Sequence, residues 1–183
     1  MTAVPLAPSA SLAAAPLAWG PAFACERPED APLVEALVGR AFGPGRYAKT
    51  AERLREGNHP RLDLSVCAWA DGDLVGVARQ WPVLIGEVPA VFLGPFAVEA
   101  GARGQGLGAA LIGRACALAQ AAQERLVLLV GEASYFEPLG FERVPSGRAV
   151  LPGPVDPRRI LWRPLAPGGL DGASGPVRVP PER

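Results

Sequence analysis

The alternation of apolar and polar positions divides the chain into a series of short elements. Residues 21–26 form an apolar run that predicts a strand, and apolar residues then recur at helical spacing behind Asp30, which stands at the expected N-cap. The charged stretch 46–56 predicts a short second helix. Apolar residues alternate on both sides of Gly72, within residues 62–77, which is typical of a β-hairpin.

The second half of the chain opens with another apolar run, residues 91–98, which predicts a third strand of the same sheet. Gly94 and Pro95 interrupt this run, and a proline removes one donor from a strand ladder. We therefore expect a bulge or a splayed strand at this point. The pattern then predicts a helix, a strand, a short helix and two strands, at residues 107–119, 125–130, 133–139, 141–144 and 159–165.

The two ends of the chain lack such periodicity. Residues 1–20 are rich in Ala and Pro and predict a flexible leader. From residue 166 to residue 183 Gly, Pro and Ser dominate, which predicts a disordered tail. A chain of 183 residues with 49% apolar content suits one domain, which we place at residues 21–165 and assign to the α/β (α+β) class.

Charge and cysteine content narrow the functional class. Lys+Arg and Asp+Glu both count 18, so the chain has no basic excess to attract nucleic acid or anionic lipid. Three widely spaced cysteines match neither a disulfide framework nor a metal-binding pair, which favours a cytoplasmic protein. No apolar run reaches membrane-spanning length.

The turn between the third strand and the following helix carries the strongest chemical signal, Arg103-Gly104-Gln105-Gly106-Leu107-Gly108. Glycines let the backbone approach a ligand closely, and the first turn of a helix leaves several N–H groups unpaired. These donors and the positive end of the helix dipole suit a pyrophosphate. Arg103 adds a planar cation at the rim. We therefore expect a nucleotide-like cofactor here.

The same turn also spells G-x-G-x-x-A, and Glu132 ends the next strand as a ribose-binding acid would in a dinucleotide-binding fold. However, residues 99–103 separate the glycines from their strand. Too few residues then remain to complete a parallel sheet. A dinucleotide-binding protein is therefore the less favoured alternative.

Two motifs in order resemble the GNAT superfamily of N-acetyltransferases. Arg103, Gly106 and Gly108 match its Arg/Gln-x-x-Gly-x-Gly/Ala signature, and the run from Tyr135 to Phe141 looks like its closing aromatic and Gly-Phe motif. Further pieces are similar to a bacterial branch of predicted, mostly uncharacterised acetyltransferases, at residues 42–46, 93–98 and 128–131. The resemblance covers residues 21–165.

This resemblance implies a three-layer domain with a mixed, splayed central sheet flanked by helices. It also implies acetyl-CoA as co-substrate, with its pantetheine arm paired to the strand ending at Val98. A primary amine on a small molecule or a peptide would attack the thioester directly, without a metal. The sequence leaves the oligomeric state open, with a homodimer as one alternative. The implied cofactor-binding residues are Phe96, Ala97, Val98, Arg103, Gly104, Gln105, Gly106, Leu107, Gly108 and Tyr135.

The catalytic residues depart from the family pattern. Phe136 occupies the position of the usual acid, a tyrosine, and Tyr135 precedes it, pointing roughly 100° away on a regular helix. We keep Tyr135 as the candidate acid. Phe92 replaces a carboxylate that some members use as base, so Glu99 is our candidate base. Other bases remain open, namely Glu87, Glu132 and His59. An inactive acyl-CoA-binding module is the alternative function.

Overall fold

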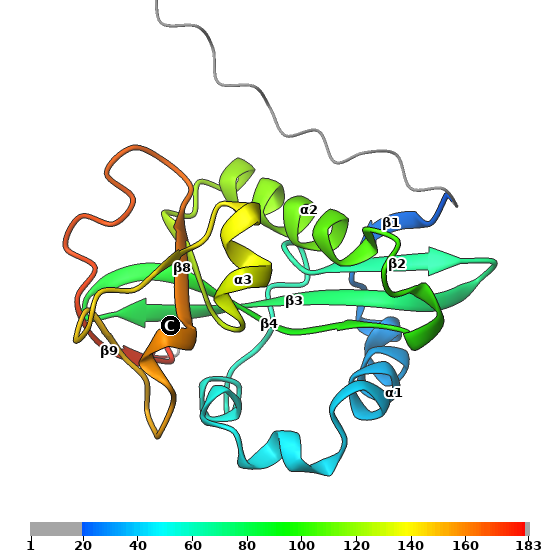
Figure 1. The fold of residues 1–183 in the computed structure, drawn as a ribbon, viewed down its shortest axis with the longest axis horizontal. Coiled ribbons are helices and arrows are strands. Elements are labelled where there is room, and N and C mark those ends of the chain that lie inside the picture. The colour runs from blue at the N-terminus through cyan, green and yellow to red at the C-terminus, as the bar shows by residue number, and fades with distance from the viewer. Residues whose placement is uncertain (1–19, 182–183) are drawn as a thin grey trace, which may run out of the picture.

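The computed structural model describes residues 20–181 (Figure 1). The expected leader, residues 1–20, lies almost entirely outside this range. The strands are β1 (Ala22–Cys25), β2 (Val66–Ala70), β3 (Asp73–Ile85), β4 (Val88–Val98), β5 (Leu126–Val130), β6 (Glu142–Arg143), β7 (Ala149–Val150), β8 (Ile160–Pro164) and β9 (Gly175–Arg178). The α-helices are α1 (Ala31–Phe42), α2 (Leu107–Ala121) and α3 (Ala133–Phe136). The 3-10 helices are η1 (Pro28–Asp30), η2 (Pro44–Ala48), η3 (Thr50–Leu54), η4 (Ala100–Ala102), η5 (Glu137–Leu139) and η6 (Pro157–Arg159).

The central sheet is mixed, with the order β1-β2-β3-β4-β5-β8-β6. The strands β1 to β4 pair antiparallel, β4 and β5 pair parallel, and β8 runs antiparallel to both β5 and β6. This arrangement differs from the parallel sheet that the dinucleotide-binding alternative needs.

Helices cover both faces of the sheet, as Figure 1 shows. Successive side chains of a strand point to opposite faces. On β3, Val77 accordingly packs in one apolar cluster with α1, whereas Ala78 packs in another with α2. The predicted three-layer domain with a mixed, splayed sheet is confirmed.

The splay begins at the Gly94-Pro95 step. Ala78 pairs with Phe96 and Gln80 with Leu93, so two residues of β4 lie opposite one residue of β3. This is the expected bulge. The parallel pairing of β4 with β5 covers only Val91↔Val127 and Phe92↔Leu128, and the two strands diverge beyond it.

Two local expectations need correction. The stretch 46–56 forms no second α-helix, because η2 and η3 are 3-10 helices. Asp30 occupies the expected N-cap position of α1, but its side chain makes no capping bond. Its carboxylate accepts hydrogen bonds from the backbone and guanidinium of Arg27 at 2.9 and 3.1 Å, and the Arg27 side chain lowers the pKa of Asp30.

The expected disordered tail is also corrected, because the described part of it belongs to the fold. Strand β9 pairs with β3 and β7, and Ala173 and Val177 are buried. Arg125 donates to the carbonyls of Gly168 and Asp171 at 3.0 and 2.9 Å. The tail has too few apolar residues to show a period, and distant segments supply the surface that orders it.

Candidate active site

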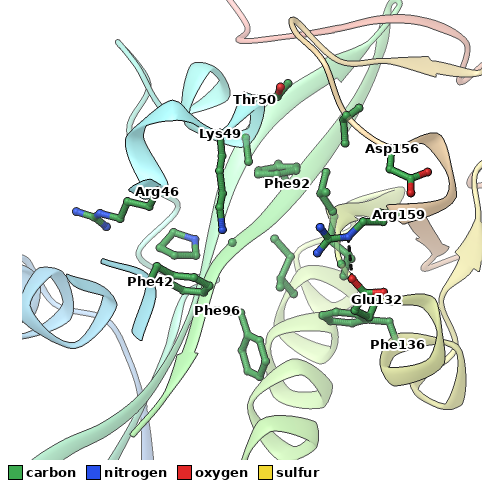
Figure 2. A pocket seen from close by; sticks show the side chains of 18 of the residues that line it. Phe42, Arg46, Lys49, Thr50, Phe92, Phe96, Glu132, Phe136, Asp156 and Arg159 are labelled. Atoms are coloured by element: carbon green, nitrogen blue, oxygen red, sulfur yellow. Dashed lines mark ion pairs between the residues drawn. The ribbon is translucent and has the colours of Figure 1, made fainter. Parts of the chain in front are cut away.

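Two neighbouring cavities lie along β4, the larger in the gap between β4 and β5 and the smaller between β4, the end of α1 and the glycine turn. The larger, of about 660 Å³, lies between these strands, residues 38–55 and residues 154–159 (Figure 2). The smaller, of about 340 Å³, lies beside Arg103, Gly104 and Gly108. Phe42, Phe96 and Tyr135 line both cavities, so the two meet at these rings.

The open edge of β4 offers backbone groups to this gap. The N–H of Glu99 donates to the carbonyl of Val75 on β3 at 2.9 Å. Since alternate residues of an antiparallel strand face the same neighbour, the N–H and C=O groups of Phe96 and Val98 face away from β3. The carbonyl of Val98 accordingly accepts a bond from Arg103 Nε at 3.0 Å. These are the two residues expected to pair with pantetheine.

Ala97 differs from its two neighbours. Its backbone faces β3 by the same alternation, and its side chain is buried in the cluster of α1. Ala97 contributes only part of the wall of the smaller cavity.

The glycine-rich turn has the backbone conformation expected of an anion cradle. Gly104 and Gly106 have φ of +76° and +81°, a left-handed conformation that glycine adopts without steric cost. Helix α2 begins directly after Gly106 without a side-chain cap. Within the described chain, the backbone N–H groups of residues 104–109 have no hydrogen-bond partner. A diphosphate therefore fits this turn, because unpaired N–H groups and the helix dipole converge on it.

The other side chains of the turn have separate roles. Leu107 is buried in the core and can offer only its backbone. The Gln105 amide donates to the carbonyl of Gly101 at 3.3 Å. At Gly108 a Cβ would lie 2.9 Å from Cζ of Phe96 and would overlap the Tyr135 hydroxyl. Gly108 therefore allows these two rings to approach the start of α2.

The two aromatic side chains of α3 differ in exposure, since one is accessible and the other packs in the core. Tyr135 is 44% exposed, and burial of its hydroxyl raises its pKa, so it stays protonated at neutral pH. Phe136 is 8% exposed and packs edge-to-face on Tyr135 and Phe141. The ring in the usual acid position thus belongs to the core, while Tyr135 reaches both cavities.

The structure does not bring Glu99 to the site. Glu99 lines neither cavity, and its carboxylate accepts bonds from Arg40 Nε at 2.8 Å and from the Ala100 N–H at 3.3 Å. Its position at the exit of β4 places it against α1. Glu87 and His59 also line neither cavity. Glu132 does line the larger cavity, where it forms an ion pair with Arg159 at 3.0 Å.

Four cations of the larger cavity were missing from the sequence-based candidates, namely Arg46, Lys49, Arg55 and Arg159. They come from the segment 46–55 and from η6, which lie far from the glycine turn in sequence. The signal that could have found Lys49 is that it is the one lysine of the chain.

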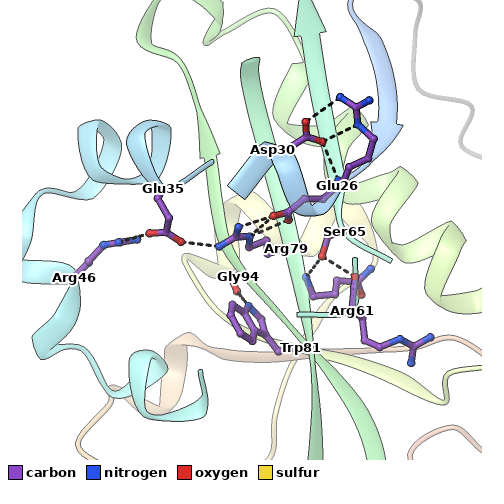
Figure 3. Close-up of polar contacts among 11 residues, drawn as sticks. Glu26, Asp30, Glu35, Arg46, Arg61, Ser65, Arg79, Trp81 and Gly94 are labelled. Carbon is purple, nitrogen blue, oxygen red and sulfur yellow. Dashed lines mark hydrogen bonds and ion pairs between the residues drawn. The ribbon is translucent and has the colours of Figure 1, made fainter. Parts of the chain in front are cut away.

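An ion network that is buried at Glu26 and Arg79 ties the segment 46–55 to the sheet (Figure 3). Arg79 on β3 donates to Glu26 at 2.9 Å and to Glu35 at 2.7 Å. Glu35 in turn accepts a bond from Arg46 at 2.6 Å. The network therefore fixes η2 relative to α1 and β3.

A cluster of metal-binding side chains and a membrane-spanning helix are both absent within residues 20–181. No three His, Cys, Asp or Glu side chains gather there closely enough to hold a metal ion. In the same range, no helix is both long and apolar enough to cross a bilayer.

Comparisons with known proteins identify similar molecules. The profile of the Acetyltransferase (GNAT) family matches residues 32–141. The GNAT family N-acetyltransferase YhbS from Escherichia coli, solved in complex with CoA, is 28% identical with a TM-score of 0.75, covering 87% of this chain and 89% of that one. A GNAT family acetyltransferase from Brucella melitensis, in complex with acetyl-CoA, is 27% identical with a TM-score of 0.54, covering 77% and 94%.

A third structure supports the fold alone. The ribosomal-protein-S18-alanine N-acetyltransferase from Escherichia coli is 19% identical with a TM-score of 0.56, covering 80% of this chain and 94% of that one. Among curated proteins, none matches the sequence.

Proposed function

Because the chain belongs to the GNAT acetyltransferase family, we propose that it transfers an acetyl group from acetyl-CoA to a primary amine by direct attack. The observation that carries this proposal is the row of unpaired N–H groups at residues 104–109, placed at the open end of the β4–β5 gap. The solved complexes of similar proteins with CoA and acetyl-CoA support the same choice of co-substrate.

In this proposal, the diphosphate of acetyl-CoA binds the N–H groups of residues 104–109. Arg103, at the edge of the glycine turn, binds the phosphate oxygens as well. The pantetheine arm pairs with the outward backbone groups of Phe96 and Val98 as an added strand. The Val98 carbonyl has two lone pairs, so it can accept from Arg103 and from the ligand together.

The acceptor amine enters from the larger cavity and attacks the thioester carbon. A carbon–nitrogen bond forms, the carbon–sulfur bond breaks, and the CoA thiolate leaves. Tyr135 at the junction of the cavities donates a proton to this thiolate. The amine loses its proton to Glu132, directly or through water, so Glu132 replaces Glu99 as our candidate base.

Calorimetric titration with acetyl-CoA, with NAD as control ligand, tests the cofactor site. We expect saturable binding of acetyl-CoA alone, and binding of NAD alone would refute the proposal. Amine-dependent release of the CoA thiol then tests turnover.

A second function, an acyl-CoA-binding module without catalysis, is favoured by one observation, the buried Phe136 in the usual acid position. Turnover with any amine would exclude this module. A cytoplasmic location and a metal-free reaction stay predictions, and a homodimer stays one alternative for the oligomeric state.

A further inference from the structure

The larger cavity carries an imbalance of charge. Four cationic side chains line it, Arg46, Lys49, Arg55 and Arg159, whereas its acidic lining residues are Glu132 and Asp156. The ion pairs of each cation show which side chains carry the excess positive charge.

Three of the cations, Arg46, Arg55 and Arg159, form an ion pair with a carboxylate. Arg46 is held by Glu35 at 2.6 Å and is directed away from the cavity in Figure 2. Arg159 is paired with Glu132 at 3.0 Å. Glu132 is one of the two acids of the lining. The other, Asp156, pairs with Arg158 at 2.8 Å.

Lys49 lacks such a pair, and Arg55 is only partly satisfied by its own. Within the described residues Lys49 has no carboxylate partner. Its Nζ lies 5.3 Å from the centre of the Phe42 ring and extends into the cavity (Figure 2). Arg55 donates through Nη1 to Glu52 at 2.9 Å, but its buried Nε has no partner among residues 20–181.

Arg55 also stands where the reaction would take place. Its guanidinium lies 5.8 Å from the centre of the Phe92 ring, and its Nη2 lies beside Gly94, at the bulge where β4 leaves β5. The neighbouring Arg46 and Arg79 add positive potential there, and burial together with these charges lowers the pKa of Arg55. An anionic ligand group would relieve both the burial and the repulsion.

We propose that Lys49 and Arg55 form a subsite for an anionic group, such as a carboxylate, on the amine acceptor. The proposal rests on the acetyltransferase function proposed above and names the substrate class of that site. The apolar walls at Phe42 and Phe92 suit the hydrocarbon body of such an acceptor.

The test begins with protein saturated with CoA. If CoA does not bind, the proposed function fails at this step, before the anionic subsite is tested. This complex is titrated calorimetrically with 3-phenylpropionate and with its neutral analogue 3-phenylpropanamide. We expect the carboxylate to bind about tenfold more tightly, since hydrogen bonds to charged groups contribute more than neutral ones. Lys49→Met should remove this difference and leave the affinity for CoA unchanged.

Arg143→Met is the matched control. Arg143 is an exposed cation on β6 that lines neither cavity, so its loss removes one positive charge and an exposed ion pair with Glu137 without altering either cavity. Equal binding of the two probes by the unmodified protein, binding of neither, or equal losses in Lys49→Met and Arg143→Met would each overturn the proposal.

Turnover supplies a second readout. Lys49→Met should raise KM for phenylalanine about tenfold and leave KM for phenylalaninamide unchanged. An equal rise for both acceptors would contradict a subsite for the anionic group.

Discussion

Replacement of Gly106 by valine distinguishes the contribution of the glycine turn to ligand affinity from its contribution to the stability of the fold. Gly106 has φ of +81° and precedes the first residue of α2. A side chain in the left-handed region costs about 1–2 kcal/mol, and a β-branched one is a genuine outlier there. The turn must either bear this strain or relax and withdraw its N–H groups.

The two consequences have different magnitudes. The strain should lower Tm by roughly 2–8 °C, since 1 kcal/mol corresponds to about 2–4 °C for a domain of this size. Withdrawal of even one N–H from a diphosphate removes a charge-assisted hydrogen bond of about 1.5–3 kcal/mol, so affinity for acetyl-CoA should fall at least about tenfold.

Gly147→Val provides the control. Gly147 has φ of +80°, lies in an exposed turn and lines neither cavity, and a Cβ added to it would meet nothing within 4 Å. This variant should lose similar stability and keep its affinity for acetyl-CoA. Calorimetry and thermal unfolding of both variants measure this. If Gly106→Val binds acetyl-CoA as tightly as Gly147→Val does, the cradle argument is refuted.

Three other predictions concern the acid, the ion network and the tail. Tyr135→Phe should lower kcat about a hundredfold, the scale of general acid catalysis, with unchanged acetyl-CoA affinity. Because burial raises the pKa of Tyr135, the unmodified enzyme should lose rate only at alkaline pH, and a pH profile of the variant should lack that loss. Arg79→Met should destabilise the fold by about 3–5 kcal/mol in denaturant titrations, since it leaves Glu26 buried without its partner. A chain ending at residue 165 should lose about 1.5–3 kcal/mol from exposure of the contacts of Val177 alone, and an unchanged Tm would contradict a structural role for β9.

Local chemistry made much of the fold predictable. The turn at Gly72 joins β2 to β3, and the proline after Gly94 coincides with the bulge. The glycine turn and the apolar face of α2 were predictable in the same way, because each depends on backbone freedom or side-chain period within a few residues.

Contacts between distant segments decided the rest. Glu99 is drawn to Arg40, which is 59 residues away in sequence, and so leaves the site. The folding of α3 against the core places Phe136 inside and Tyr135 at both cavities, which no spacing along the chain distinguishes.

The sequence by itself therefore determined most of the central strands and helices, the sheet bulge and the glycine turn, whose causes are local, but not η2, η3, β7 or β9. Only the tertiary structure decided which charged side chains surround the acceptor cavity and that the tail completes the sheet. The physical reason is that burial and ion pairing depend on which surfaces meet, and those surfaces come from segments such as β3 and β9 that are far apart along the chain.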